Sequence, residues 1–233
     1  MNTNEELQKR ARIVNAALDL YVNESDKFTL KNIAKKARVK EAEIYSYFPN
    51  KTAILKDFYS GIVPQYKEMI REIEGFDQYD LSEKLSNFVY SSLDMMQERR
   101  DFVEKTFDDL IVGSYQKPEF QYQVERLVED FVKEDRRIAG SNQYLLNSFS
   151  YNFLSKEYLK LVRFWIGDES AGSEKTMALT DKLTAFLNEI LYTSVLDKGF
   201  DLGHFLVTNR IIRPNIPFWE NCVEQFVDRG TYK

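Results

Sequence analysis

Residues 41–51, EAEIYSYFPNK, combine side chains that donate hydrogen bonds with rings that can pack. Tyr45 and Tyr47 carry phenolic hydroxyls, and Lys51 stands just after a proline. Phosphate oxygens accept hydrogen bonds from hydroxyl and ammonium groups, so phosphate binding is the chemistry these residues suggest. The segment is only about two helical turns long, too short to hold a core of its own. Neighbouring elements must therefore position it.

Hydrophobic periodicity predicts the helices around these residues. Apolar residues recur every three or four positions in residues 5–23, which predicts an amphipathic helix. Thr29 stands where it can cap a second helix, over residues 30–37. Residues 40–48 predict a third helix, and Asn50 can cap a fourth. Two short helices joined by a tight turn and braced by a longer one form a helix-turn-helix unit.

The third helix has two different sides. Pro49 ends it, because the residue before a proline resists helical dihedral angles. Ala42 and Tyr45, with Ile44 beside them, are expected to face the other helices. An outward helix face can enter the major groove of DNA, while tyrosine hydroxyls and Lys51 reach phosphates on either side. The outward side chains are Lys40, Glu41, Glu43, Ser46 and Tyr47.

Charge is distributed unevenly along the chain, although the net charge is only −5. Residues 1–56 hold eleven Lys and Arg against seven Asp and Glu, a net of +4. Residues 57–233 hold 21 against 30, a net of −9. This polarity predicts a small unit that meets phosphates and a larger one that does not. Within the small unit, Lys35, Lys36 and Arg38 either contact phosphates or form a solvated basic face.

Length and composition indicate a soluble, mostly helical protein. The 233 residues are 43% hydrophobic and 30% charged, with nine Gly and five Pro, a balance that disfavours disorder and β-sandwiches. Cys222 is the only cysteine, so no intrachain disulfide can form and a reducing cytoplasm is expected. Glu5 and Glu6 stand where an export signal would be apolar, and the uncharged window 138–155 is too polar to span a membrane.

Residues 12–55 carry a series of spaced features: ALDLY at the end of the first helix, Phe28-Thr29, Ile33-Ala34, Ala37, Val39 and the run IYSYFPNK. In this combination the segment resembles the DNA-binding domain of the TetR family of bacterial transcriptional regulators. The resemblance implies an all-α fold, with a three-helix helix-turn-helix domain over 1–56 and a larger helical ligand-binding and dimerisation domain over 57–233. The candidates for DNA contact are Thr29, Lys40, Glu41, Tyr45, Ser46, Tyr47 and Lys51.

The segment departs from the family pattern at two positions. Arg38 stands where the family commonly has glycine, so it must adopt a left-handed backbone or a different turn. Lys40 stands where a Ser or Thr usually caps the recognition helix, and its charge opposes the helix dipole. Glu41 and Glu43 offset that charge, but they bring carboxylates toward DNA.

The larger segment has the pattern of a helical domain rich in aromatic residues. Beyond residue 56 lie 28 of the 33 aromatics, which indicates a bulky core or a cavity lined by rings. No β-type alternation persists in this part of the sequence. Helices are predicted over 64–74, 81–99, 101–115, 119–137, 143–166, 174–197 and 215–229.

The resemblance implies a small-molecule site in the larger domain, because the corresponding helices enclose a pocket in family members. Each candidate lining residue has a simpler alternative as an ordinary core residue. A largely aromatic pocket with a few hydroxyls favours an apolar or aromatic ligand. The candidates are Phe58, Tyr66, Phe88, Met95, Phe107, Tyr115, Phe120 and Tyr151.

The helices predicted over 143–166 and 174–197 resemble the pair through which family members dimerise as a four-helix bundle. A two-fold dimer would set two recognition helices about 34 Å apart on a palindromic operator. The alternative is that their apolar side chains complete the core of one subunit. The interface candidates are Leu159, Val162, Phe164, Trp165, Leu183, Phe186, Leu187, Ile190 and Leu191.

Pro64 falls inside what would otherwise be one long helix leaving the DNA-binding unit. Proline removes a backbone hydrogen bond, so we expect the helix to bend or divide there. A kink at this position is a candidate for transmitting ligand binding to the recognition helix.

No residue pattern indicates an enzyme, a metal site or a cofactor. His204 is the only histidine, and it lacks the neighbours of a catalytic triad or a zinc site. Cys222 shares a helical face with Trp219, Val223 and Phe226. It is therefore expected to be a buried apolar residue, with a redox-sensing thiol as the alternative.

The resemblance implies a repressor that binds double-stranded operator DNA as a homodimer and is released by a small ligand, which the aromatic composition suggests is apolar. Release requires the ligand to prefer a conformation that cannot bind DNA. The contrasting hypothesis is a TetR-like fold that has lost DNA binding and acts as a lipid- or isoprenoid-binding accessory protein, which Arg38 and Lys40 support. DNA affinity that falls with salt would separate the two. The operator, the regulated genes, the ligand and the direction of regulation stay open.

Overall fold

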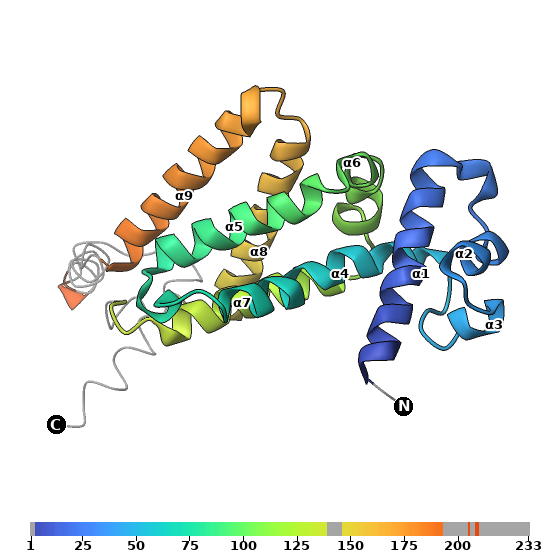
Figure 1. Ribbon diagram of the computed structural model, residues 1–233. Coiled ribbons are helices and arrows are strands. Elements are labelled where there is room, and N and C mark those ends of the chain that lie inside the picture. The colour runs from blue at the N-terminus through green and yellow to red at the C-terminus, as the bar shows by residue number, and fades with distance from the viewer. Residues whose placement is uncertain (1–2, 139–145, 193–204, 206–207, 210–233) are drawn as a thin grey trace.

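The computed structural model describes residues 3–138, 146–192, 205 and 208–209, and the regular secondary structure of these ranges is helical (Figure 1). The prediction of an all-α fold is confirmed for this part of the chain. Its α-helices are α1 (Thr3–Asn23), α2 (Leu30–Ala37), α3 (Glu41–Ile44), α4 (Lys51–Ile70), α5 (Leu81–Gln97), α6 (Arg100–Phe107), α7 (Glu119–Glu134), α8 (Ser148–Ile166) and α9 (Glu174–Tyr192).

Shorter helical turns join several of these helices. A π-helical turn at Asp108–Val112 follows α6, so the helix predicted over 101–115 divides in two. The remaining turns are of the 3₁₀ type, at Ser25–Lys27, Phe76–Gln78 and Ala171–Ser173. The helix predicted over 215–229, like His204 and Cys222, lies outside the described residues.

Helices α1, α2 and α3 form the small unit with the expected helix-turn-helix order. Its core consists of side chains that are almost wholly buried, among them Ile13, Ala17, Ile33 and Ile44. Thr29 caps α2 by accepting a hydrogen bond from the Asn32 amide at 3.2 Å. Local capping and a shared apolar core therefore give this unit its shape.

Helix α4 runs from the small unit into the larger one and lies beside α7 there (Figure 1). It passes without a break through residues 56 and 57, where the two units are expected to meet. Pro64 was expected to bend or divide this helix; it does not divide it, because α4 continues to Ile70. Val63 and Tyr66 are buried on either side of the proline, and their packing holds the helix across the missing hydrogen bond.

Interlocking aromatic rings fill the core of the larger unit. The rings of Tyr59 and Phe102 lie 5.8 Å apart, and those of Phe88 and Tyr158 lie 5.0 Å apart. The buried hydroxyls keep partners, since Tyr59 lies 2.8 Å from the Thr106 hydroxyl. Burial raises the pKa of Tyr59 well above its usual range, so this group is an uncharged structural element of the core.

Helix α9 packs along α5 through a seam of hydroxyl groups. The hydroxyls of Ser86 and Thr184 lie 2.9 Å apart, and Tyr90 donates a short hydrogen bond to Asp181. Three buried threonines repeat every fourth residue on this side of α9: Thr176, Thr180 and Thr184. Leu191 is also buried near the end of α9, whereas Leu183 and Phe186 on the same helix are exposed.

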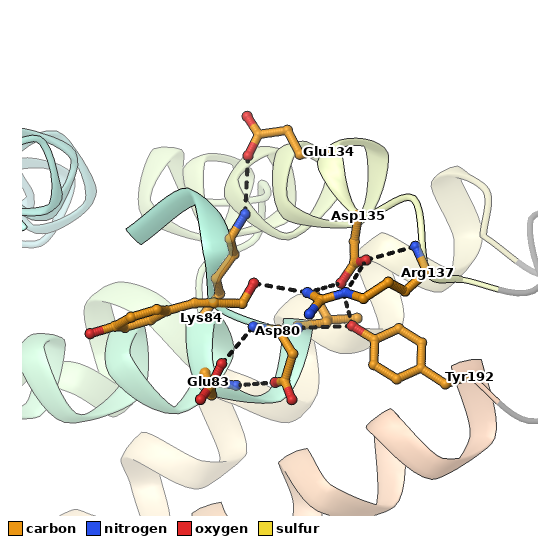
Figure 2. A network of polar contacts seen from close by, with 9 residues as sticks. Asp80, Glu83, Lys84, Glu134, Asp135, Arg137 and Tyr192 are labelled. Atoms are coloured by element: carbon orange, nitrogen blue, oxygen red, sulfur yellow. Dashed lines mark hydrogen bonds and ion pairs between the residues drawn. The ribbon is translucent and has the colours of Figure 1, made fainter. Parts of the chain in front are cut away.

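The end of α9 is fastened to the ends of α5 and α7 by a polar network (Figure 2). Tyr192 donates a short hydrogen bond to Asp135 and accepts one from the Leu81 amide at 3.0 Å. Arg137 donates to Asp135 at 2.9 Å and to the Tyr79 carbonyl at 2.9 Å. The network joins three segments that lie far apart in sequence, around residues 80, 136 and 192. No helix in the described ranges is long and apolar enough to cross a membrane.

Candidate nucleic-acid interface and apolar groove

The turn between α2 and α3 is built on Arg38 in a left-handed conformation, with φ 58° and ψ 45°. Its amide donates to the Lys35 carbonyl at 3.3 Å, and the Val39 amide donates to the Ala34 carbonyl at 3.0 Å. The chain therefore makes the turn that glycine usually makes, and a residue with a Cβ atom costs about 1 to 2 kcal/mol there. This turn fixes the angle at which α3 leaves α2.

Helix α3 is shorter than expected, since it spans Glu41–Ile44 and not residues 40–48. The backbone then tightens, with hydrogen bonds from the Ser46 amide to the Glu43 carbonyl at 3.2 Å and from Tyr47 to Ile44 at 3.0 Å. These bonds span three residues, as in a 3₁₀ turn, because Pro49 prevents the α-helix from continuing. Lys40 precedes α3 in an extended conformation without a side-chain cap.

In and after α3, the buried side chains are not the ones that were expected to face the other helices. Ile44 and Phe48 are buried, whereas Ala42 is exposed and Tyr45 is 58% exposed. The prediction that Ala42 and Tyr45 face inward is therefore wrong. Two large apolar side chains four residues apart share one side, and burying both turns Tyr45 toward solvent. Its hydroxyl is available to a partner outside the subunit.

Tyr47 is half-buried against the first turns of α1. A hollow of about 560 Å³ separates the two elements, and Lys9 and Arg10 of α1 line it opposite Ser46 and Tyr47. The carboxylate of Asp57 on α4 accepts a hydrogen bond from Arg10 Nε at 3.0 Å, which raises the pKa of the guanidinium. Lys9 and Arg10 were not among the residues predicted to contact DNA, because the periodicity of α1 shows its buried side but not what its other side meets.

Lys51 and Thr29 lie together at the N-termini of α4 and α2. The Lys51 ammonium donates to the Phe28 carbonyl at 3.0 Å and lies 4.9 Å from the centre of the Phe28 ring. Asn50 caps α4 by accepting from the Ala53 amide at 2.9 Å. Helix N-termini carry partial positive charge, so these two ends and the ammonium form a place suited to a phosphate.

The proposed ligand-binding residues divide into a packed group and an isolated one. Tyr66 and Phe88 are buried with rings 5.1 Å apart, and Phe107 and Phe120 are buried around Tyr59. Tyr151 is also buried, whereas Phe58 and Met95 are half-buried beside the core. Tyr115 is fully exposed, at 102% of its reference area, so it does not join the others. The helix ends before Tyr115, which therefore extends into solvent from a turn.

An apolar groove of about 390 Å³ lies between α5, α7, α8 and α9, and Phe88 is the ligand candidate that lines it. Helices α8 and α9 diverge from the turn that joins them (Figure 1), and α5 and α7 complete the walls. Hydroxyls of Tyr158, Thr180 and Thr184 interrupt the hydrocarbon surface. The apolar walls include Leu85, Val89, Val124, Val128, Leu161 and Leu179.

Helices α8 and α9 also expose large apolar side chains. Four of the interface candidates are buried inside the subunit: Leu159, Val162, Trp165 and Leu191. For these four, the alternative holds that they complete the core of one subunit. The periodicity of α8 shows an apolar side but cannot say whether the subunit core already occupies it. Leu187 and Ile190 are half-buried. The exposed group consists of Phe149, Phe153 and Phe164 on α8 and Leu183 and Phe186 on α9.

The two units are joined near the start of α6 by a shared carboxylate. Asp19 of α1 accepts from Arg99 at 2.8 Å, and Lys36 of α2 lies 3.5 Å from its other oxygen. Lys105 of α6 adds a hydrogen bond to the Val22 carbonyl at 3.3 Å. Movement of α6 would therefore act directly on α1. Through Asp19 it would also act on α2, the helix before the turn that leads into α3.

Two family models match the chain. The one described as bacterial regulatory proteins, tetR family, matches residues 13–58. The one described as tetracyclin repressor-like, C-terminal domain, matches residues 84–206, which is more than half of the 233 residues. The comparison with curated proteins gave no match.

One solved structure shows the same fold, and two others are similar at a lower level. A TetR transcriptional regulator from Nitrosomonas europaea is 20% identical with a TM-score of 0.55, and the match covers 76% of this chain and 96% of that one. A TetR transcriptional regulator from a Rhodococcus species is 16% identical, covering 79% of this chain and 98% of that one, with a TM-score of 0.48. A tetR-family regulator from Streptomyces coelicolor is 16% identical, covering 99% of both chains, also with a TM-score of 0.48.

Proposed function

Because the chain belongs to the TetR family of bacterial regulatory proteins, we propose that it is a homodimeric repressor that a small apolar ligand releases from its operator. The observation that carries the DNA-binding part is the presentation of Tyr45. Its ring is 58% exposed on a turn whose other side is locked into the core by Ile44 and Phe48. A rigid element with one free side is what a major groove requires.

The DNA contacts divide into two kinds. Tyr45, Ser46 and the exposed Glu41 lie on the element that enters the groove, where they meet base edges. Lys51 and Thr29 lie at helix N-termini and hold phosphate oxygens. Lys40 and the half-buried Tyr47 flank the element and add contacts to the backbone of the duplex.

The exposed apolar side chains of α8 and α9 support dimerisation. Phe149, Phe153 and Phe186 are each more than half exposed in the described part of the subunit. Surfaces of this kind usually mark an interface between proteins. A second copy pairing its own α8 and α9 with these helices would bury the rings and set two recognition turns on one side of the dimer.

The groove between α8 and α9 supports a ligand that is mostly hydrocarbon. Its walls are mostly apolar, and the polar features are the hydroxyls of Tyr158, Thr180 and Thr184 together with the charged side chains of Glu157 and Lys160. A ligand there contacts both helices of the proposed dimer interface as well as α5 and α7. It shifts the population of subunit arrangements if it binds one arrangement more tightly than the other.

The test is binding to genomic DNA fragments, followed by anisotropy measurements on the selected site across a range of salt. The expected logarithm of the association constant falls linearly with the logarithm of salt concentration. Lys51→Ala should weaken binding to all sequences and reduce that slope by about one. Tyr45→Phe should weaken the selected site while leaving the salt slope unchanged. A protein that retains no fragment at low salt would contradict the proposal.

A second candidate function is a ligand-binding accessory protein without DNA affinity. The features that favour it are the two carboxylates in the first turn of α3, Glu41 and Glu43, together with the uncapped start of that helix. Carboxylates at this place repel phosphates unless they accept from a base. Such a protein would bind a lipid or isoprenoid in the groove and ignore DNA at every salt concentration, so the same titration separates the two functions.

A further inference from the structure

Lys84 is the buried lysine of the described residues, with only 4% of its surface exposed. It lies in the first turns of α5, where its ammonium contacts Glu134 at 3.4 Å (Figure 2). That contact is long for a charged hydrogen bond, and the Glu134 side chain is 65% exposed at the last residue of α7. A buried ammonium is stable only when it is well paired, and one distant, solvated carboxylate pairs it weakly.

Two aromatic rings flank the ammonium. Phe76 and Phe131 each lie with their ring centre 5.7 Å from Lys84 Nζ. Such contacts stabilise a cation but use none of its three hydrogen-bond donors. Glu134 accepts from one of these donors, so the ammonium keeps the capacity to bind a further acceptor.

Lys84 also lines an open hollow of about 430 Å³, bordered by the end of α4, the turn that follows it, and α7. Its inner walls are hydrocarbon, formed by Ile70, Ile73 and Leu127 together with the two rings. At the rim, Lys67 pairs with Asp130 at 2.9 Å. The hollow thus combines one buried cation with apolar walls, and it is separate from the groove between α8 and α9.

We propose that this hollow binds an organic monocarboxylic acid with an apolar body, its carboxylate on Lys84 and its hydrocarbon against Phe76 and Phe131. The ligand's carboxylate takes the place of the Glu134 carboxylate, which turns into solvent, so the charge around Lys84 stays balanced. Apolar walls select against compact inorganic anions, and the buried ammonium selects against neutral analogues. The inference stands independently of DNA binding.

The charges around the hollow are consistent with a single negative group and not with several. Arg71 at the rim pairs with Glu68, and Asp77 adds a carboxylate near the mouth. A dianion would meet that carboxylate and Asp130 without gaining a second buried cation. The chemistry therefore points to one carboxylate for each ligand.

Calorimetric titration with 4-phenylbutanoate and octanoate tests the site, with 4-phenylbutanamide and inorganic phosphate as comparison ligands. Wild-type protein should bind the carboxylates saturably and the amide at least about tenfold more weakly, because the charged hydrogen bond is lost. Lys84→Met should remove that discrimination, whereas Lys67→Met, at the exposed rim of the same hollow, should change the affinity less than about threefold.

Glu134→Gln provides a variant that does not depend on altering the buried residue. Removing the competing carboxylate should raise the affinity for 4-phenylbutanoate several-fold, while a purely structural Lys84–Glu134 pair would leave the ligand unbound in both proteins. Unfolding curves show whether Lys84→Met is folded. The proposal is overturned if no carboxylate binds, if Glu134→Gln does not bind more tightly than wild type, or if phosphate binds while the organic acids do not.

Discussion

The carboxylate of Asp19 lies between two cations from different parts of the molecule, with Arg99 at 2.8 Å as its closer partner. Arg99 begins the helix that follows α5, whereas Asp19 belongs to the first helix of the small unit. Lys36, at 3.5 Å, ties the same carboxylate to α2. The Asp19 side chain therefore connects the larger unit to α2, the helix that leads into the turn before α3.

Asp19→Asn removes the charge from this junction. We expect the free energy of unfolding to fall by about 1 kcal/mol, because a partly exposed carboxylate with two partners contributes slightly more than an isolated surface pair. Urea denaturation measures the change. Lys160→Met, which breaks the exposed Lys160–Glu157 pair on α8, should cost less than about 0.5 kcal/mol; equal losses in the two variants would contradict a special role for Asp19.

Arg38→Gly should increase the free energy of unfolding by up to about 1 kcal/mol. Arg38 holds a left-handed backbone with φ 58°, which glycine adopts without the steric cost of a Cβ atom. Thermal and urea denaturation measure the change. Lys35 is an exposed residue inside α2, and Lys35→Gly should lower the free energy of unfolding by about 1 kcal/mol. The two substitutions are therefore expected to change stability in opposite directions.

Phe186→Ser tests the interface proposed for α8 and α9. Phe186 is 63% exposed on α9, so its removal should leave the subunit core intact. The dimer dissociation constant should rise at least about tenfold, since a large ring at the centre of an interface contributes strongly. Sedimentation velocity across a concentration series measures it. Val112→Ser, another exposed apolar position far from these helices in sequence, is the matched control and should leave the constant unchanged.

Asp135 gives the protein a specific dependence on pH. Burial alone would raise the pKa of its carboxyl, but hydrogen bonds from Arg137 and Tyr192 outweigh burial and lower the pKa to about 2. A folded-state pKa below the unfolded value near 3.9 stabilises the fold fully above about pH 5, and this contribution is lost as the pH falls toward 2. Its size is about 2 kcal/mol at neutral pH.

Asp135→Asn should therefore flatten the stability profile between about pH 5 and pH 2. Unfolding free energies from urea titrations at several pH values measure this slope. Asp130→Asn, which removes a half-exposed carboxylate paired with Lys67, should change the profile much less. A profile that keeps its wild-type steepness without Asp135 would show that other carboxylates dominate the acid response.

Most of the small unit could be predicted from sequence because its signals are local. Thr29 and Asn50 cap the helices that they precede, as their positions indicated. The direction in which Tyr45 points could not be predicted from local signals. It depends on whether the other helices bury the pair Ile44 and Phe48 or the pair Ala42 and Tyr45. Ile44 and Phe48 occupy that core, and a single helical period does not distinguish them from Ala42 and Tyr45.

The larger unit shows the same limit at longer range. Periodicity predicted helices where α8 and α9 lie in the described residues, whereas the resemblance implied an interface role for Trp165, with the core of one subunit as the alternative, and the subunit buries this residue. Phe149 and Phe153 are exposed at a spacing of one helical turn, and this spacing was the signal that could have identified the outer side of α8. The burial of Lys84 could not be predicted from the sequence around it. It arises because α5, the turn that carries Phe76 and the end of α7 meet around this side chain.

The hydroxyl seam between α5 and α9 has a consequence for how the protein comes apart. Hydroxyl pairs such as Ser86 with Thr184 can be replaced by water at little cost, unlike the interlocked rings beneath α8. The part of α9 that precedes Leu191 and the Tyr192 network can therefore open locally while the aromatic centre stays closed. Its amide protons should exchange with solvent deuterium before those of α8, and a bound second copy would erase that difference.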